Sequence, residues 1–370
     1  MYEKKIVDDN TFIVEFSEPV KAISSTIVGG GLGELTHVVF HRVDRDFNEP
    51  SPKAYARSLV LGLGLPVDTS AVFLTAVDVV REHVELSLGN EDAWIIATIG
   101  LSPLACIGGS RAIGYEASTI NVLLATSRVL SNNALVDLVS LIASTKTLAL
   151  VDLGLSCSSG GRVFSTITDA VIVASKKEDE QGPVEIYGGP ATRLGALVAE
   201  KLYELILGYG LEKKNIHERF QDIFSEPVEW VVDRALEAYR NAPIPGVEYS
   251  EVRESIRSEL ELLLKDPNIW ALGIAAKSLD YYGRAGSIPS LPRREYLADS
   301  KRMVADELLG ISLALYINGW KALFSYYWID RVKNSISGLG DKPMFIDDIL
   351  ASLIGSILSR VYDKYLTGRS

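Results

Sequence analysis

Cysteine and histidine are scarce in this sequence. Among its 370 residues there are 2 cysteines, Cys106 and Cys157, and 4 histidines. Two cysteines do not make a disulfide framework, so a reducing compartment, the cytoplasm, is the expected location. Neither cysteine has a basic neighbour in the sequence that would activate it, so a thiol nucleophile is not expected.

Long hydrophobic runs and an excess of positive charge are also missing. No apolar run reaches the roughly 18 residues of a spanning helix, and the opening MYEKKIVDDN holds no signal core. Residues 1–224 contain 28 acidic and 19 basic residues, and residues 225–370 contain 20 and 18. Neither part has the basic surface of a nucleic-acid-binding protein or a general attraction to anionic membranes. We expect small-molecule substrates, no nucleic acid and no membrane, and a homo-oligomer remains open.

The first part of the chain alternates strand and helix patterns. Short β-branched segments bounded by turn residues predict strands at KIVDD, TFIVEF, KAISSTIV, THVVFHRV, SAVFLTAV, EHVELSLG, AWIIATIGL, STINVLLATS and DAVIVAS. Helical periodicity appears in SPKAYARSLVLGL, in SNNALVDLVSLIASTKTLALVDLG and in ATRLGALVAEKLYELILGYG. Ser131 is a suitable N-cap for the second of these helices, and Gly154 ends it.

Strand patterns disappear after about residue 225. Helical periodicity then predicts helices at 227–240, 249–265, 268–283, 293–319, 321–334 and 345–366. A chain of this length favours two domains. We therefore predict an α+β domain with a mixed sheet and flanking helices over residues 1–222, followed by an all-α domain over residues 223–370.

The stretch SSTIVGGGLGE, residues 24–34, does not have the spacing of a dinucleotide-binding loop or a Walker loop. An apolar, β-branched segment follows it where either motif requires a helix. The stretch predicts a glycine turn between two strands, and a ligand-binding loop formed by Gly29, Gly30 and Gly31 is the alternative.

Three acidic positions stand on the last predicted helices. They are Asp306 with Glu307, Asp330 with Lys333 one turn later, and Asp347 with Asp348. Carboxylates on neighbouring helices can share one divalent cation, and small residues at Ala351, Gly355 and Ser359, with Ser352 and Ser356 beside them, allow close helix packing. The alternative is that Asp347 and Asp348 only complement the helix N-terminus.

The motifs ADELLG, SYYWIDRVK and FIDDILASLIGSILSR resemble, in this order, the phosphatidylglycerophosphatase A-like family, whose α-ribazole-phosphate phosphatase members act in cobamide synthesis. The resemblance covers about 268–366 and implies Mg²⁺-dependent phosphomonoester hydrolysis. By this resemblance Asp306, Glu307, Asp347 and Asp348 hold the metal, and Asp330 and Lys333 serve the phosphate. Some relatives carry His-Thr where this chain has Pro343 and Met344. Phosphatidylglycerophosphate is the alternative substrate.

Polar residues interrupt apolar segments of the first part, at the ends of strands and the starts of helices: Thr75, Thr98, Thr119, Asn121, Lys146, Thr168 and Asp169. Singly, each is expected to be a satisfied core residue or a cap. Together they stand where α/β proteins place their sites. His37 and His41 share one face of a predicted strand, and a core or surface role is preferred over metal binding or catalysis.

The segments that contain these polar residues resemble, in order, the adenosylcobinamide amidohydrolase family. The resemblance covers about residues 20–210 and is most specific from Thr119 to Gly154. The family hydrolyses the amide that joins aminopropanol to the corrin. Ser144, Ala191 and the run Ser165–Asp169 depart from its pattern. The resemblance leaves Asp169 or His37 as the base, and Lys146, Asn121 or the glycine-loop N–H groups as stabilisers of the oxyanion.

Together the two resemblances match a bifunctional hydrolase of cobamide salvage. The threonines at 75, 98, 119 and 168 and the glycine loop are then expected on the substrate side. A first domain that binds a corrinoid without catalysis is the alternative from another functional class.

Overall fold

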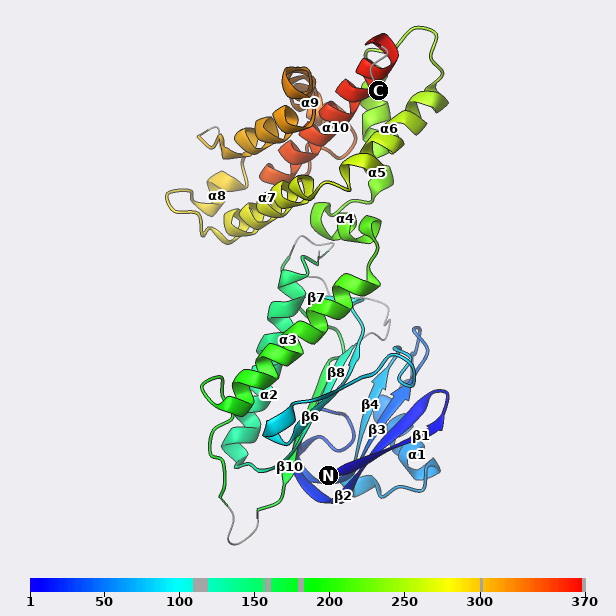
Figure 1. Ribbon diagram of the computed structural model, residues 1–370, viewed down its shortest axis with the longest axis vertical. Coiled ribbons are helices and arrows are strands. Elements are labelled where there is room, and N and C mark those ends of the chain that lie inside the picture. The colour runs from blue at the N-terminus through cyan, green and yellow to red at the C-terminus, as the bar shows by residue number, and fades with distance from the viewer. Residues whose placement is uncertain (109–118, 156, 158–160, 179–182, 300–301, 368–370) are drawn as a thin grey trace. The chain divides into compact units, whose positions relative to one another are not determined.

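The computed structural model describes residues 1–108, 119–155, 157, 161–178, 183–299 and 302–367, and its internal contacts divide the chain into two units, Met1–Lys213 and Lys214–Ser370 (Figure 1). The boundary predicted after residue 222 falls inside helix α4 (Ile216–Phe224), at the start of the second unit.

The first unit is built on a mixed sheet, as predicted. Its strands are β1 (Tyr2–Asp8), β2 (Thr11–Ser24), β3 (Gly31–Arg42), β4 (Ser70–Thr75), β5 (Val84–Ser87), β6 (Ala93–Ile99), β8 (Ile120–Val129) and β10 (Ala170–Lys176). They pair in the order β4-β3-β2-β10-β8-β6-β5, with β1 added to β2. The β3–β4 and β8–β10 pairs are parallel and the other pairs are antiparallel.

Three helices flank this sheet: α1 (Pro52–Gly62), α2 (Asn132–Asp152) and α3 (Arg193–Lys213). Strand alternation gives the sheet two apolar faces. In β8, Val122 and Leu124 share a core with α2 and α3, while Leu123 and Ala125 pack with Phe12, Phe40 and Phe73 on the other face. The sheet curves around that second face, so that Tyr2 and Lys4 of β1 reach β5 and donate to Glu85, each at 2.6 Å. The predicted N-cap is confirmed, since Ser131 accepts from the Ala134 N–H.

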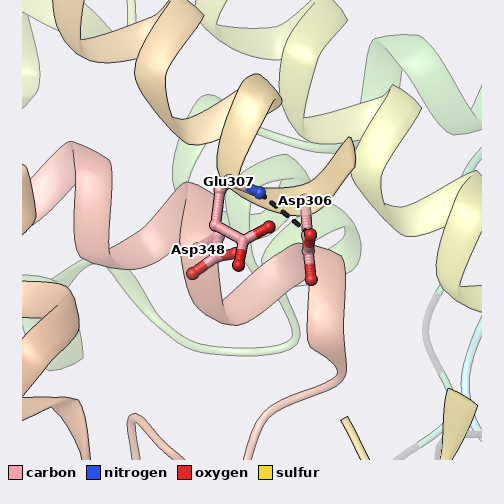
Figure 2. A group of neighbouring side chains, drawn as sticks. All are labelled: Asp306, Glu307 and Asp348. Atoms are coloured by element: carbon pink, nitrogen blue, oxygen red, sulfur yellow. Dashed lines mark hydrogen bonds between the residues drawn. The ribbon is translucent and has the colours of Figure 1, made fainter. Parts of the chain in front are cut away.

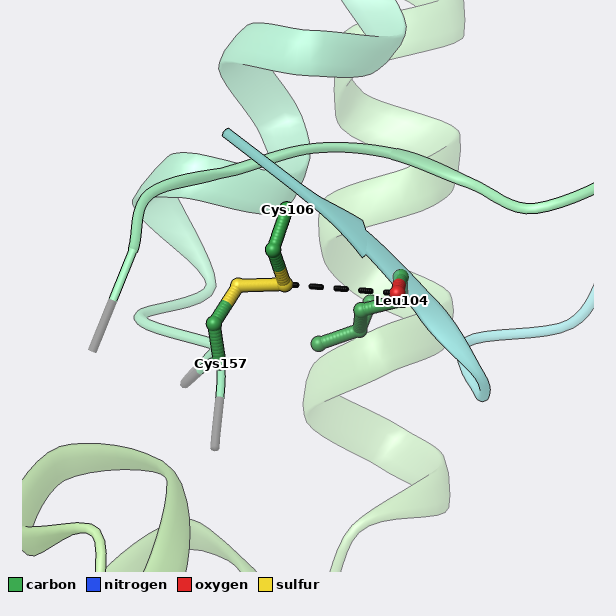
Figure 3. The surroundings of a disulfide bond; sticks show 3 residues. All are labelled: Leu104, Cys106 and Cys157. Carbon is green, nitrogen blue, oxygen red and sulfur yellow. Dashed lines mark hydrogen bonds between the residues drawn. A yellow bond between two sulfur atoms is a disulfide. The ribbon is translucent and has the colours of Figure 1, made fainter. Parts of the chain in front are cut away.

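A second, two-stranded sheet carries a disulfide that the sequence analysis did not expect. Strands β7 (Leu104–Cys106) and β9 (Val163–Thr166), both missed by the sequence patterns, pair antiparallel. Cys106 and Cys157 are bonded to each other, with their Cα atoms 6.1 Å apart (Figure 3). The expectation of unlinked cysteines was wrong because the β7–β9 pairing joins segments that are distant in sequence. The argument for a reducing compartment from cysteine usage is lost with it.

The second unit contains many helices: α4, α5 (Val228–Tyr239), α6 (Tyr249–Leu263), α7 (Pro267–Ala285), α8 (Arg293–Tyr296), α9 (Ala305–Val332) and α10 (Met344–Thr367). Five of the six predicted helices match one of these or part of one. The predicted helix 293–319 was wrong, since α8 ends at Tyr296 and α9 begins at Ala305. Helix α4 was not predicted, although Asn215 and Glu218 form a capping box at its start.

Helix α9 is a helical hairpin. Asn318 and Gly319 have non-helical backbone angles, and Gly319 has a positive φ of 60°. The halves pack against each other, because a Cβ at Gly310 would lie 2.6 Å from the ring of Tyr326. The sequence anticipated this break between its helices 293–319 and 321–334.

Helix α10 lies against this hairpin through its small residues. A Cβ at Gly355 would lie 2.6 Å from the Tyr326 N atom, and Ser352 Oγ donates to the Gly310 carbonyl at 2.7 Å. The close packing expected from the small residues of this helix is confirmed.

Helices α2 and α9 are long and apolar enough to cross a membrane by length and composition alone. Each half of α9 is only about 20 Å long at 1.5 Å per residue, against about 30 Å of bilayer hydrocarbon. The turn at Gly319 therefore excludes α9 as a single span in this conformation.

Candidate functional site

The second unit brings together carboxylates from two helices. Asp306 and Glu307 lie in the first turn of α9, and Asp348 lies in the first turns of α10 (Figure 2). One carboxylate oxygen from each residue lies within 4.8 Å of those from the other two. Three of the four residues predicted to bind metal thus share one site.

Asp347, the fourth residue, lies outside this group of three and forms an ion pair with Lys333. Lys333 Nζ lies 3.0 Å from Asp347 Oδ2, 3.1 Å from Asp330 Oδ1 and 3.3 Å from Asp348 Oδ1. Lys333 and Asp330 are one turn apart at the C-terminal end of α9. The structure therefore joins all six residues that the sequence selected, with Lys333 linking Asp330 to the start of α10.

This group of acids is held at a cost in free energy. Burial, followed by the neighbouring Asp306, raises the pKa of Glu307 to about 7. Burial raises the pKa of Asp347 to about 7, and burial with the adjacent Asp347 raises the pKa of Asp348 to about 8. Burial lowers the pKa of Lys333, but Asp347 and Asp348 outweigh it and leave that pKa above its usual value. One lysine does not neutralise the charge of these carboxylates.

The residues fit a divalent cation. In the described part of the chain, Glu307 Oε2 and Asp347 Oδ1 are buried without a hydrogen-bond partner. So is the Tyr326 hydroxyl, whose pKa is raised by burial and then by Asp348. Buried carboxylate oxygens without donors are the ligands that hard cations take. Tyr326 escaped the sequence analysis, although it stands four residues before Asp330 on the same helical face.

Asp280 of α7 fixes the start of α10. Its Oδ1 accepts the Phe345 N–H at 3.0 Å and its Oδ2 accepts the Ile346 N–H at 3.1 Å, while Tyr296 donates to Oδ1 at 2.6 Å. These are N–H groups of the first turn of α10, next to Asp347. No local sequence signal marked Asp280, because the groups it bonds lie 65 and 66 residues away.

In the first unit, Lys146 and Asp169 form a buried ion pair at one edge of the sheet. Lys146 Nζ lies 3.0 Å from Asp169 Oδ2 and donates to the Ile120 carbonyl at 3.3 Å. Asp169 also accepts from the Ile120 N–H, at 2.8 Å, and from the hydroxyls of Ser165 and Thr166. Sequence reasoning gave no role to these two hydroxyls. Asp169 therefore ties α2 and β9 to the starts of β8 and β10.

Three predicted residues lie unpaired beside this ion pair. Thr98 and Asn121 face each other across β6 and β8, and Asn121 also neighbours Ala170 of β10. Asn121 is 1% exposed, and its Nδ2 has no hydrogen-bond partner among the described residues. The buried hydroxyls of Thr98 and Thr119 have none there either. We call Thr98, Thr119 and Asn121 the polar edge.

The glycine loop reaches the same edge of the sheet. Ser25, at its start, bonds the backbone of Val171 in both directions, at 2.9 Å each. A Cβ at Gly29 would lie 2.5 Å from the Ser70 carbonyl, and a Cβ at Gly30 would lie 2.2 Å from the Thr26 carbonyl. Packing and turn geometry thus account for these two glycines, whereas Gly31 borders open space.

The remaining predicted residues lie in other places. Thr168 is exposed in the turn before Asp169. Thr75 pairs with Arg42 at the far end of β3, so it lies at the opposite edge of the sheet. His37 contacts Thr36 Oγ1 at 2.8 Å and, with Val39, lies on the α1 side of the sheet, the reverse of the face with Asn121. His41 bonds Thr11 and Tyr55. The structure therefore separates Thr75 and His37 from the polar edge.

The profile of the adenosylcobinamide amidohydrolase family matches residues 1–217, more than half of the chain. The chain belongs to this family. Adenosylcobinamide amidohydrolases of Methanosarcina mazei and Halobacterium salinarum are each 30% identical to it, over 56% and 53% of this chain and 96% and 81% of theirs. These matches agree with the resemblance read from the sequence between residues 20 and 210.

The names of three further similar proteins state no activity. An uncharacterized protein of Methanocaldococcus jannaschii is 35% identical over 118 residues, which are 31% of this chain and 90% of that protein. The low temperature requirement C protein of Listeria monocytogenes aligns over 42% of this chain and 99% of its own, with a TM-score of 0.35 and 19% identity. Protein ypjQ of Bacillus subtilis covers 42% of this chain at a TM-score of 0.34 and 16% identity.

Proposed function

We propose that the first unit hydrolyses adenosylcobinamide to adenosylcobyric acid and aminopropanol. In this reaction a water oxygen adds to the amide carbonyl carbon, the C–N bond breaks, and the amine leaves with a proton. The observation that carries the proposal is the polar edge of the first unit, in a chain that belongs to the amidohydrolase family. Its buried donors lack partners among the described residues, so an amide group can satisfy them.

Two residues of the polar edge bind the substrate amide in this proposal. Asn121 Nδ2 and the Thr98 hydroxyl donate to the carbonyl oxygen, where negative charge grows as water adds. Asp169 is a positioning residue, since its oxygens already accept from Lys146, Ile120, Ser165 and Thr166. Lys146 is a positioning residue too, since it projects from α2 on the sheet face of Val122 and Leu124 and acts through its ion pair with Asp169. His37 has no role here, because it lies on the other face of the sheet.

The test is turnover of adenosylcobinamide by the purified chain, with adenosylcobyric acid and aminopropanol quantified by chromatography. We expect both products in equal amounts. Corrinoid binding without either product would support the alternative of a binding module, and the proposal of catalysis would be abandoned.

For the second unit we propose a divalent-cation-dependent phosphomonoesterase that acts on α-ribazole 5′-phosphate. Asp306, Glu307 and Asp348 would hold Mg²⁺ or a similar cation, and the raised pKa values of Glu307 and Asp348 support this assignment. When bound, the cation supplies a Lewis acid for a phosphoryl oxygen. Lys333 donates to the phosphate, and Asp330 and Asp347 orient Lys333.

The family of the first unit favours this substrate over a lipid phosphate. The amidohydrolase family of the first unit places the chain in corrinoid chemistry, and ribazole belongs to the same cofactors. Phosphate release from α-ribazole phosphate and from phosphatidylglycerophosphate, each with Mg²⁺ and with a chelator, separates the alternatives. Release from the lipid alone would replace the proposed substrate, and release from neither would refute a phosphatase.

A further inference from the structure

The helical hairpin α9 exposes a broad apolar face. Its exposed side chains follow helical spacing in both halves: Leu308, Leu315 and Tyr316 before the turn, and Trp320, Phe324, Tyr327 and Trp328 after it. Trp320 and Phe324 are 69% and 66% exposed. We call these seven residues the α9 face.

The two halves of the hairpin combine their residues into one surface. Gly310 touches Tyr326, and these residues stand eight positions before and after Asn318 at the turn. This register places Leu308 level with Trp328, and Tyr316 level with Trp320. Ser312, level with Phe324, is the exposed polar residue in the middle. The buried residues Gly310, Leu313 and Ala314 lie instead on the side of the helical core.

The α9 face exposes more apolar area than the largest patch of a typical monomeric protein. Aromatic side chains present roughly 150 to 250 Å² each, so five of them, each more than half exposed, with two leucines, leave about 700 Å² uncovered. The largest apolar patch of a typical monomer is about 300 to 600 Å². One partner in a standard protein interface buries about 800 Å². The face thus has the size and the aromatic character of an interface centre.

The charged residues near the α9 face indicate which kind of partner binds it. Between Leu308 and Ile329 the only charged residue is Lys321, and it pairs with Asp363. An anionic membrane requires a basic rim, which this segment lacks. A face without charge at its centre can meet its own copy without like-charge repulsion.

The rim of the face is complementary to itself. Arg331, at the open end of the hairpin, is exposed and contacts the Tyr327 ring and hydroxyl. Asp266, at the turn end, is partly exposed and accepts from the Tyr316 hydroxyl at 2.8 Å. No oppositely charged side chain pairs with either residue in the part of the chain that the structure describes. A two-fold axis through the middle of the face would bring Arg331 of one copy to Asp266 of the other.

We propose that two copies of this chain associate through the α9 face about a two-fold axis. The full-length protein is then a dimer at micromolar concentration. Analytical ultracentrifugation tests this with the single variants Trp320→Glu and Phe324→Glu. Each buries a charge at the interface and raises the dissociation constant at least about 30-fold, the effect of a central interface residue. Leu262→Glu, at an exposed leucine of α6, is the matched control and leaves the dimer intact.

A cross-link gives a second test that does not depend on destabilisation. Ser312→Cys, near the proposed axis, forms a covalent dimer on mild oxidation, while Ser258→Cys on α6 does not. Arg331→Glu weakens association several-fold, because it would face Asp266. A wild-type protein that is still monomeric at roughly 50 to 100 μM refutes the proposal, because an interface of standard size binds more tightly than this. Equal loss in the Leu262→Glu control also refutes it. So does binding of the monomer to phosphatidylglycerol vesicles that Trp320→Glu abolishes.

Discussion

The buried polar edge of the first unit is destabilising when considered alone. A buried donor or acceptor without a partner costs about 1 to 3 kcal/mol of folding free energy. Thr98, Thr119 and Asn121 carry this cost side by side, at the edge where Lys146 pairs with Asp169. Groups that weaken the fold and converge on one place are typical of sites organised for a ligand.

Thr98→Val removes one unpaired hydroxyl at nearly constant volume. We expect the free energy of unfolding to stay the same or rise by up to about 1 kcal/mol. We expect the turnover of adenosylcobinamide to fall about 10- to 100-fold, because a donor to the developing oxyanion is lost. Chemical denaturation and product chromatography measure the two effects.

Ser175→Ala is the matched control for this prediction. Ser175 Oγ is also buried without a partner, but it lies at the other end of β10. Its turnover should equal that of the wild type. An equal loss in both variants would show that the effect is not local to the polar edge.

Lys146→Met leaves the Asp169 carboxylate buried without its positively charged partner. Removal of one partner of a buried ion pair typically costs about 3 to 5 kcal/mol. We expect a loss of this size in urea unfolding, and partial recovery in the double variant Lys146→Met/Asp169→Asn, which removes the stranded charge. A double variant less stable than Lys146→Met would contradict the role of Asp169 as the charge partner.

Among the elements, the start of α10 depends most on a distant residue. Asp280 of α7 accepts the first N–H groups of α10, which sets the position of Asp347 and Asp348. Burial raises the pKa of Asp280 to about 6, against the hydrogen bonds from Tyr296 and the α10 backbone that lower it. Between about pH 4 and 6 the folded chain therefore holds more protons at this residue than the unfolded chain. Stability from this group is present at low pH and is lost as the pH rises through 6.

Asp280→Asn removes this titration and places an amide N–H against an α10 N–H. We expect the variant to be less stable than the wild type at all pH values. The difference should be larger at pH 4 than at pH 7, by on the order of 2 kcal/mol. Urea unfolding at both pH values measures it. The comparison with the wild type cancels the titration of other groups, and a difference that does not change with pH would refute the assignment.

Local sequence patterns predicted most elements but not the contacts between distant segments. Alternation and periodicity placed the strands, and the acidic motifs selected Lys333 and the five carboxylates grouped with it. The same patterns missed β7, β9 and the Cys106–Cys157 bond, because only tertiary pairing of short segments creates them. They grouped Thr75 with Thr98, since sequence does not show that β3 and β4 run in parallel and carry Thr75 to the opposite edge. Asp280 was missed for the same reason.

At the scale of the whole molecule, two units carry chemically different sites on one chain. The polar edge belongs to Met1–Lys213, and the carboxylates belong to Lys214–Ser370. Among the described residues, no hydrogen bond or ion pair joins a residue of one site to a residue of the other. The two proposed activities should therefore be separable by single substitutions in the full chain.

Asp348→Asn tests this separation. We expect it to weaken Mn²⁺ binding at least about tenfold, as measured by electron paramagnetic resonance, because a charged oxygen ligand becomes an amide. Phosphate release from α-ribazole phosphate should fall at least as much, and hydrolysis of adenosylcobinamide should remain within about twofold of the wild type. Thr98→Val should give the reverse pattern, with intact Mn²⁺ binding and phosphate release. Loss of both activities in either variant, with the fold intact by circular dichroism, would mean that the two units act as one site.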